Sequence, residues 1–430
     1  MHKKIYKKAL KVIPNGSMLF SKKPEIYLPG GWPTYFKKSK GIFIWNLNNK
    51  KLNDLYFGVG QNILGYANPK IDREVINACK NGNMSSLNCV EEVKLAEKLV
   101  EMHPWADMVK FARSGGEINS IAIRIARAAT GKDGVVICGY HGWHDWYLAA
   151  NLKNKQSLNK HILKGLDPHG VSKSLKNTVF TFNYNDFNQL KKIVSKKNIG
   201  TIMMEVKRDK EPKDNFLKKV RKLCDEKKIV LIFDECTSGF RQSFGGLHKC
   251  YKVNPDMAVF GKALGNGYAI TSLLGRRSIM EEAQKTFISS TFWTERIGYV
   301  AALKTLSEMK KLQSWKIITE NGLYVKKLWR DIANDNGLDL NIFGLDAIPS
   351  FSFKNKNLEY KTLIIQEMLK KNYLVSNSVF LSVGHNKRVI KKYINHLNNV
   401  FRLIKKCEDG DNIYKYLKYP VCYSPFDRLN

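Results

Sequence analysis

The sequence lacks clustered cysteines and long apolar runs, and each absence excludes a class of protein. Its 8 cysteines include no C-x-x-C pair and no Cys/His cluster at zinc spacing, so we expect reduced thiols and no metal. No stretch approaches the ~18 consecutive apolar residues that a membrane-spanning helix requires. The lysine-rich residues 1–9 are not followed by a long apolar run, so we expect a cytoplasmic protein with no signal peptide and no membrane partner.

Acidic residues are also scarce: there are 38 of them against 72 basic residues, which gives a formal charge of +34. Such a charge attracts phosphate through counterion release, so a nucleic-acid-binding protein is one alternative. However, no nucleic-acid-binding motif accompanies the charge, and the lysines are dispersed over many segments. We therefore interpret the charge as a lysine-rich surface and expect no nucleic-acid partner.

The middle of the chain alternates short apolar runs with segments of helical spacing. The runs that we predict to be buried strands are residues 135–138, 179–182, 201–204, 229–233 and 257–260. A helical pattern covers residues 216–224 between two of them. This alternation predicts an α/β fold with a mostly parallel central sheet covered by helices.

The pattern changes near residue 300 to that of a smaller α+β domain. We expect an N-terminal segment (1–55) that packs with the small domain, a large domain (56–300) and a C-terminal small domain (301–430) whose tail, from residue 407 on, wraps the surface. The expected elements of these outer parts are a strand at 41–45, helices at 300–309, 363–369 and 390–404, and a strand at 350–353.

In a parallel α/β sheet, ligands bind beyond the carboxyl ends of the strands, and reactive side chains follow two of the predicted strands. Asp234 comes directly after the run 229–233, where a carboxylate is placed to meet a cofactor nitrogen. Lys262 follows the run 257–260 in a glycine-rich setting, and burial or a nearby cation would make it a nucleophile toward an aldehyde. The alternatives are a helix-capping aspartate and a solvated surface lysine.

Three further motifs suggest a bound phosphate and a planar ring. Residues 114–116 (Ser-Gly-Gly) precede a helical segment, whose backbone N–H groups and dipole favour an anion, although the Gly-Lys-Ser/Thr ending of a P-loop is missing. Tyr140 follows the run 135–138 and is placed to stack on a ring; for the neighbouring His141, an ordinary hydrogen-bonded loop is the alternative. The hydroxyls of residues 289–291 either bind phosphate or cap a helix.

In their order and spacing, these motifs resemble the core of the class III PLP-dependent aminotransferases (PLP, pyridoxal 5'-phosphate). The matching stretches are residues 64–69, 114–117, 234–241 (Asp-Glu-Cys-Thr-Ser-Gly-Phe-Arg), 254–256 (Asn-Pro-Asp) and 261–267 (Gly-Lys-Ala-Leu-Gly-Asn-Gly). The resemblance implies a PLP-dependent transferase type I fold and a homodimer with shared active sites. It also implies PLP as the cofactor and a ping-pong Schiff-base mechanism between an amino donor and a carbonyl acceptor (a sugar, a semialdehyde or a keto acid).

The family's motifs imply catalytic roles for Lys262 as the Schiff-base lysine, Asp234 facing the pyridine nitrogen, and Tyr140 stacking on the ring. The other cofactor-binding residues that the resemblance implies are Ser114, Gly115 and Gly116 at the phosphate, His141 beside Tyr140, Glu205 near the cofactor, Cys236 beneath the ring, and Thr291, which reaches the phosphate of the neighbouring subunit's cofactor.

Departures from the family pattern bear on the substrate. Residues 17–20 read Ser-Met-Leu-Phe, where the aminomutase of the glutamate-1-semialdehyde type has an arginine for a substrate carboxylate. Arg113 replaces a usual asparagine beside the phosphate loop, and we expect it to bind an anionic substrate or the phosphate. An intramolecular aminomutase is the alternative to the aminotransferase. The presence of Lys262, Asp234 and Tyr140 argues against a member that has lost catalysis.

Overall fold

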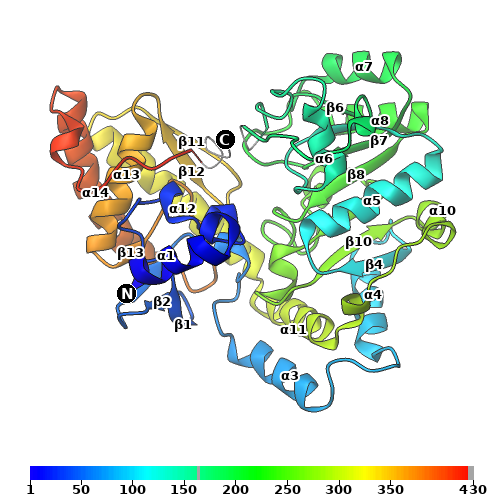
Figure 1. Cartoon of the computed structure of the whole chain (residues 1–430), viewed down its shortest axis with the longest axis horizontal. Coiled ribbons are helices and arrows are strands. Elements are labelled where there is room, and N and C mark those ends of the chain that lie inside the picture. The colour runs from blue at the N-terminus through cyan, green and yellow to red at the C-terminus, as the bar shows by residue number, and fades with distance from the viewer. Residues whose placement is uncertain (162–164, 425–430) are drawn as a thin grey trace. The chain divides into compact units, whose positions relative to one another are not determined.

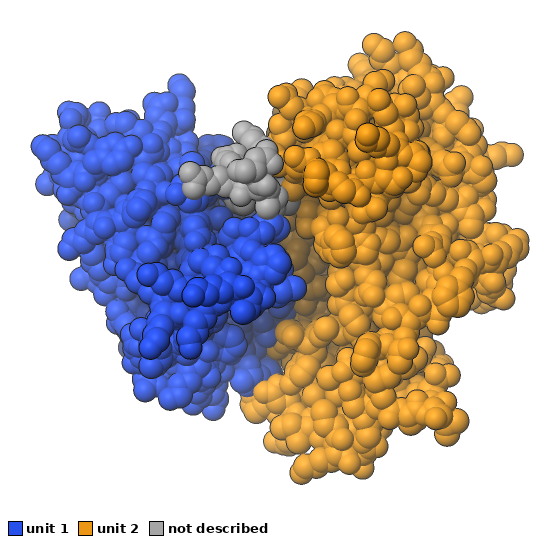
Figure 2. Space-filling view, in the orientation of Figure 1, with its two compact units in different colours: residues 1–68, 314–428, 430 blue, residues 69–313, 429 orange. Residues whose placement is uncertain are grey.

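The computed structural model describes residues 1–161 and 165–424, and the chain divides into two compact units (Figures 1 and 2). One unit comprises Pro69–Gln313. The other combines Met1–Asn68 with the described residues from Ser314 onward. All the candidate site residues lie in the unit of residues 69–313.

A seven-stranded sheet forms the centre of the unit of residues 69–313, in the order β4-β10-β9-β8-β7-β5-β6. The strands are β4 (Met108–Ala112), β5 (Gly134–Cys138), β6 (Val179–Thr181), β7 (Ile199–Met204), β8 (Val230–Glu235), β9 (Met257–Phe260) and β10 (Thr271–Gly275). The pairings from β6 through β9 are parallel, whereas β10 pairs antiparallel with both β9 and β4. The predicted strands are confirmed as β5 to β9, and the sheet is mostly parallel, as expected.

Helices make up much of the rest of this unit (Figure 1). They are α3 (Pro69–Lys80), α4 (Val90–Met102), α5 (Gly115–Thr130), α6 (Asp145–Leu148), α7 (Phe187–Lys196), α8 (Phe216–Lys227), α9 (His248–Tyr251), α10 (Arg277–Met280) and α11 (Arg296–Leu312). The pattern at 216–224 is confirmed as part of α8. Helix α5 contacts the central strands β7 to β10 through a buried face that includes Ile118, Ile121, Ala122 and Ile125, and this packing fixes its N-terminus at the carboxyl edge of the sheet.

The second unit contains a four-stranded sheet in the order β1-β2-β3-β13 and a separate hairpin of β11 and β12. Its elements are α1 (His2–Val12), β1 (Phe36–Lys40), β2 (Phe43–Asn46), β3 (Lys51–Asp54), α2 (Phe57–Gly60), α12 (Ser314–Asp335), β11 (Leu340–Phe343), β12 (Ser350–Phe353), α13 (Asn357–Lys370), β13 (Tyr373–Leu374) and α14 (Lys387–Glu408). The strands predicted at 41–45 and 350–353 and the helices predicted at 363–369 and 390–404 are confirmed here. The helix predicted at 300–309 is confirmed within α11.

The described part of the C-terminal tail packs along α13. The backbone N–H of Cys422 donates to Thr362 Oγ1 at 2.9 Å, and that of Lys418 donates to Gln366 Oε1 at 2.6 Å. The last part of the predicted tail, residues 425–430, lies outside the described residues. Within the described ranges, no helix is both long enough and apolar enough to cross a membrane.

Candidate active site

The carboxyl ends of four parallel strands bring the predicted side chains to one edge of the large sheet. Tyr140 and His141 follow β5, Glu205 follows β7, and Asp234 lies near the end of β8. Lys262 begins the 3-10 turn (Lys262–Gly265) that follows β9. Open α/β sheets bind their ligands at this edge.

Asp234 is buried and is held by three donors. Its Oδ2 atom accepts from His141 Nδ1 at 2.8 Å and from Asn119 Nδ2 at 2.8 Å, and its Oδ1 accepts from the backbone N–H of Cys236 at 3.0 Å. Burial by itself would raise the pKa of Asp234, but the hydrogen bonds, that of His141 first, outweigh burial and lower this pKa below its ordinary value. The carboxylate is therefore ionised at neutral pH.

The neighbouring carboxylate, Glu235, points to the other face of β8, as strand alternation requires. It accepts from His248 Nδ1 at 2.6 Å and from Ser238 Oγ at 2.9 Å, and it is fully buried. Of these two carboxylates, only Asp234 accepts hydrogen bonds from His141 and Asn119. Glu235 instead fixes the loop that leads into α9.

Lys262 belongs to a chain of polar contacts that ends at Glu205. Its Nζ donates to Thr237 Oγ1 at 2.6 Å, and Arg208 approaches the same hydroxyl at 3.5 Å. Arg208 also pairs with Glu205 at 3.2 Å. Burial, followed by the positive charge of Arg208, lowers the pKa of Lys262 to about 8. The lowered pKa increases the neutral fraction of this amine near neutral pH, and the role of Lys262 as a nucleophile stays a prediction.

Tyr140 and Glu205 are held together by the backbone between β5 and the following loop. The N–H of Tyr140 approaches Glu205 Oε2 at 3.4 Å. A Cβ on Gly139, whose φ is +123°, would lie only 2.7 Å from the same oxygen, so the close approach requires glycine. Burial raises the pKa of the Tyr140 phenol, which therefore stays neutral and packs edge-on against Tyr147, with ring centroids 5.8 Å apart.

The Ser-Gly-Gly motif forms the N-terminus of α5. The Glu117 carboxylate accepts from the backbone N–H groups of Arg113 and Ser114, at 2.9 and 3.2 Å. The next amides, those of Gly115 and Gly116, belong to the first turn, where N–H groups have no acceptor within the helix. A Cβ on Gly116 would lie 2.9 Å from His144, so there is no room for a side chain at this position. We call the first turn of α5, with the amides of Gly115 and Gly116, the phosphate cradle. Such a terminus binds an anion.

Cys236 lies between the N-terminus of α5, where the Ser-Gly-Gly motif is, and the segment that precedes Lys262. Its Sγ would be 3.4 Å from a Cβ on Gly115 and 3.1 Å from a Cβ on Gly261. Burial and the adjacent Asp234 raise the pKa of this thiol, so it stays protonated. The side chain therefore acts as a small apolar surface rather than a nucleophile.

Thr291 differs from the other candidates because its side chain is exposed. It begins a 3-10 turn (Thr291–Thr294) that Arg113 holds in place. The Arg113 guanidinium donates to the carbonyls of Phe292, Trp293 and Glu295, at 2.9, 3.0 and 2.6 Å. Arg113 therefore positions the turn that contains Thr291. Its place beside the phosphate loop had instead suggested that it binds an anionic substrate or the phosphate.

Three residues of the site were not identified from the sequence: Asn119, Thr237 and Arg208. Asn119 lies one turn into α5, and Thr237 lies inside the 234–241 motif, so both were adjacent to recognised signals. Arg208 has no such signal, because it is one of 72 basic residues and only the fold brings it to Glu205.

These features fit PLP. The two glycine amides suit its phosphate, the ionised Asp234 suits a protonated ring nitrogen, and the nucleophilic amine of Lys262 suits its aldehyde. One buried atom of the cluster, His141 Nε2, has no hydrogen-bond partner within the described residues. Within the same ranges, no group of three or more metal-ligating side chains was found.

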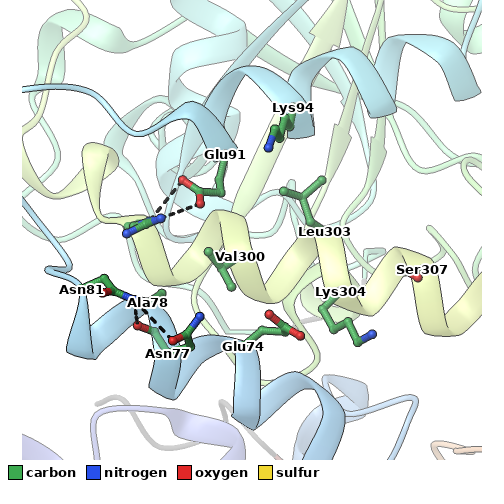
Figure 3. Close-up of a pocket in the computed structure, with 11 residues that line it drawn as sticks. Glu74, Asn77, Ala78, Asn81, Glu91, Lys94, Val300, Leu303, Lys304 and Ser307 are labelled. Atoms are coloured by element: carbon green, nitrogen blue, oxygen red, sulfur yellow. Dashed lines mark hydrogen bonds and ion pairs between the residues drawn. The ribbon is translucent and has the colours of Figure 1, made fainter.

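A separate cavity, of ≈ 320 Å³, is lined by residues from α3, α4 and α11 (Figure 3). Its wall carries the bidentate pair of Arg296 and Glu91, with distances of 3.1 and 2.8 Å. None of the predicted site residues lines this cavity, which is therefore distinct from the candidate active site.

Comparison with known proteins agrees with this geometry. The family model for aminotransferase class-III matches residues 30–373. A 3-aminobutyryl-CoA aminotransferase from Cloacimonas acidaminovorans is 31% identical over 392 residues, which cover 89% of this chain and 90% of that protein. A glutamate-1-semialdehyde 2,1-aminomutase from Campylobacter hominis is 35% identical over 369 residues, which cover 82% of this chain and 79% of that protein.

Solved structures show the same fold. The PLP internal aldimine form of FumI from Sphingopyxis sp. MTA144 has a TM-score of 0.86 at 22% identity, covering 96% of this chain and 99% of that one. A glutamate-1-semialdehyde-aminomutase from Pseudomonas aeruginosa has a TM-score of 0.80 at 15% identity, covering 94% of each chain. The chain therefore belongs to the class III aminotransferases, whose fold and PLP cofactor it shares.

Proposed function

We propose that this protein moves an amino group from a small-molecule amino donor to a carbonyl acceptor, with Lys262 as the residue that attaches PLP. When bound, PLP supplies an aldehyde carbon for the amine and a ring that takes up electrons. One observation carries the proposal: a lysine whose pKa is lowered to about 8 follows β9, at the same edge of the sheet where the ionised carboxylate of Asp234 lies near the end of β8. β8 and β9 pair so that Asp234 lies opposite Val259, three positions before Lys262.

Lys262 has two tasks in this proposal. Its Nζ would hold the cofactor through the aldehyde carbon, and the same atom, when free, would take a proton from a substrate carbon and give it back. A group with a pKa of about 8 populates both protonation states near neutral pH, so it can accept the proton and return it. The hydroxyl of Thr237, 2.6 Å away, orients the amine for both tasks.

The other candidates hold the cofactor. Asp234, fixed by His141 and Asn119, keeps a proton on the ring nitrogen, and Tyr140 covers one face of the ring. The remaining roles that we assign are Ser114, Gly115 and Gly116 at the phosphate, Cys236 beneath the ring, and Glu205 beside it.

We also infer a homodimer in which Thr291 reaches the partner's cofactor. Exposed apolar side chains near the phosphate cradle support it: Leu87 is 82% exposed, Phe287 is 85% exposed and Phe292 is 67% exposed. The segments that carry Leu87 and Phe292 are joined by a hydrogen bond, since the carbonyl of Asn83 accepts from the N–H of Arg296 at 2.9 Å. The carbonyl of Phe287 accepts from Arg124 of α5 at 2.8 Å. An apolar face of this kind favours association, and a second copy of the chain would cover it beside Thr291.

The proposal is tested by replacing Lys262 with Ala. We expect loss of turnover and of the visible absorbance of the bound cofactor, whereas Lys192→Ala, an exposed lysine on α7, keeps both. Mixing the purified protein with amines, amino acids and amino sugars while that absorbance is followed would identify the donor. A Lys262→Ala protein with normal turnover would refute the mechanism.

An intramolecular aminomutase is the second candidate, because several relatives are glutamate-1-semialdehyde 2,1-aminomutases. The Ser-Met-Leu-Phe sequence at residues 17–20 argues against it, since the arginine expected for the substrate carboxylate is missing. Turnover that requires a separate amino donor supports the aminotransferase, and turnover of a single substrate that carries both groups supports the aminomutase.

A further inference from the structure

A cavity of ≈ 640 Å³ adjoins the candidate active site within the unit of residues 69–313. Glu205 and Arg208 belong to both, because they line the cavity and also lie in the chain of contacts that reaches Lys262. A molecule in this cavity is therefore two hydrogen bonds from the reactive amine: Arg208 to Thr237, and Thr237 to Lys262. The volume is within the range of about 300–1,000 Å³ that is typical of small-molecule pockets.

The cavity has an excess of positive charge. Arg208, Lys160 and Lys210 line it, against the carboxylates of Glu205 and Asp209. Glu205 is already compensated by Arg208, at 3.2 Å. Among the described residues, neither Lys160 nor Lys210 forms an ion pair. An anion is the ligand that this arrangement favours.

Neutral donors complete the lining. The backbone N–H of Gly139 donates to His161 Nδ1 at 3.1 Å, so the ring hydrogen is on Nε2. Burial lowers the pKa of His161 to about 4, and the ring is therefore an uncharged donor at neutral pH. Asn159 Oδ1 accepts from the N–H of Gly165 at 3.0 Å, which makes the Nδ2 end of this amide a second donor.

We propose that this cavity binds a phosphoryl group carried by the substrate, held by Arg208, Lys160 and Lys210. A phosphoryl group offers three oxygen atoms, so each of the three cationic side chains can donate to one of them, whereas a carboxylate offers only two. The inference rests on the proposed function, because it treats the occupant of the cavity as the compound whose carbonyl or amine reaches Lys262. It gives Arg208 a substrate-binding role.

Calorimetric titration of the PLP-loaded enzyme tests the proposal with three probes: methyl phosphate, inorganic phosphate and malonate. We expect methyl phosphate to bind at least as tightly as inorganic phosphate, and malonate to bind more weakly. Arg208→Gln should weaken methyl phosphate binding by about tenfold or more, as expected for a lost charge-assisted hydrogen bond. Lys210→Gln, a change at an exposed side chain that does not threaten folding, should weaken it severalfold.

Arg73→Gln is the matched control, because it removes one positive charge from an exposed position on α3 of the same unit. Equal weakening by Arg73→Gln and Arg208→Gln would overturn the proposal, since it would reduce the effect to net charge. Tighter binding of malonate would overturn it in favour of a carboxylate. Binding of inorganic phosphate without methyl phosphate would overturn it in favour of a free-phosphate site.

The two proposals fail in different ways. The titration monitors heat and needs no turnover, so wild-type enzyme that holds PLP but binds no methyl phosphate refutes the cavity proposal alone. Lys262→Ala protein with normal turnover refutes the proposed function, whatever the titration gives.

Discussion

The amine of Lys262 is surrounded by groups that favour its neutral form. At pH 7.5 a group with a pKa of about 8 is roughly one quarter neutral, whereas an ordinary lysine, near 10.5, is about 0.1% neutral. Burial contributes most to this shift, and the charge of Arg208 follows. Residues remote in sequence thus determine how fast this lysine reacts with an aldehyde.

Removing the Arg208 charge should reverse part of that shift. We expect Arg208→Gln to raise the pKa of Lys262, because the remaining burial disfavours the ammonium form less than burial and a nearby cation together. The rate at which apoprotein takes up PLP, measured by stopped flow from pH 6 to 10, should show a midpoint near pH 8 in the wild type and a higher midpoint in the variant. A midpoint that stays fixed or moves down would contradict this account, and Arg73→Gln serves as the control.

The neighbours of Asp234 favour its charged form, whereas those of Lys262 favour the neutral amine. The pKa of Asp234 is lowered only because hydrogen bonds, that of His141 first, outweigh burial. Replacing His141 with Phe leaves the carboxylate buried without that donor, so its pKa should rise. When the solution is acidified, the carboxylate of the variant is then protonated at a higher pH than in the wild type, and activity that needs the ionised form is lost at that higher pH. The acid limb of kcat/KM against pH should move upward in His141→Phe and stay in place in His169→Phe, an exposed histidine; an unmoved limb in both would remove His141 from this role.

The residues that could be predicted from the sequence are those whose position follows from a strand end. Asp234 comes directly after one apolar run, and Lys262 follows another after Gly261. The parallel pairing of β8 with β9, which sets Asp234 opposite Val259, then brings both residues to the same edge of the sheet. Arg208 and Arg113 could not be predicted in the same way. Their guanidinium groups reach Glu205 and the carbonyls of residues 292–295 through tertiary contacts, which periodicity does not encode.

At the scale of elements, the parallel strands were predictable and the antiparallel ones were not. β5 to β9 are short apolar runs between helical segments, and that rhythm identifies them. β4 contains Lys110 within Met-Val-Lys-Phe-Ala, and β10 follows β9 after a glycine-rich turn rather than a helix. Neither strand is an unbroken apolar run between helical segments, so no pattern in the sequence predicts their place beyond β9 in the sheet.

The junction of α5 with the loop after β5 is the element on which phosphate binding depends. Gly142 has a φ of +110°, and a Cβ there would lie 2.7 Å from the Cα of Gly116. Gly142→Ala should therefore displace the cradle. We expect at least a tenfold loss of PLP affinity and a fall of about 2–4 kcal/mol in the free energy of unfolding.

Gly131→Ala is a matched control for that change. Gly131 ends the same helix with a φ of +63°, and nothing lies within 4 Å of its added Cβ. This variant should lose only about 1 kcal/mol, from backbone strain, and should keep its PLP affinity. Urea denaturation and titration with PLP measure the two effects separately, and equal PLP affinities in both variants would contradict the assigned role of the cradle.

At the scale of the whole molecule, the turn of residues 291–294 is held in place and yet exposes an apolar ring, which a second copy of the chain would explain. Arg113 makes two hydrogen bonds to this turn and a third to the carbonyl of Glu295 just after it, yet the Thr291 side chain is exposed, as is the neighbouring ring of Phe292. A second copy on this face would bury the ring and bring Thr291 to the partner's phosphate. Sedimentation at micromolar concentration should then give a dimer, and a monomer with full activity would exclude shared sites.

Shared sites can be detected by complementation. Lys262→Ala should be inactive, and Thr291→Glu should be weakly active because it places a carboxylate at the phosphate, whereas Thr291→Ser keeps the hydroxyl and most of the activity. In a hybrid of Lys262→Ala with Thr291→Glu, isolated through two different tags, one site combines both changes and the other combines neither if Thr291 acts across the interface. Such a hybrid should regain about half of the wild-type activity, since one of its two equivalent sites is intact. If Thr291 acts within its own chain, both sites are damaged and the hybrid has no more than half the low activity of the Thr291→Glu homodimer.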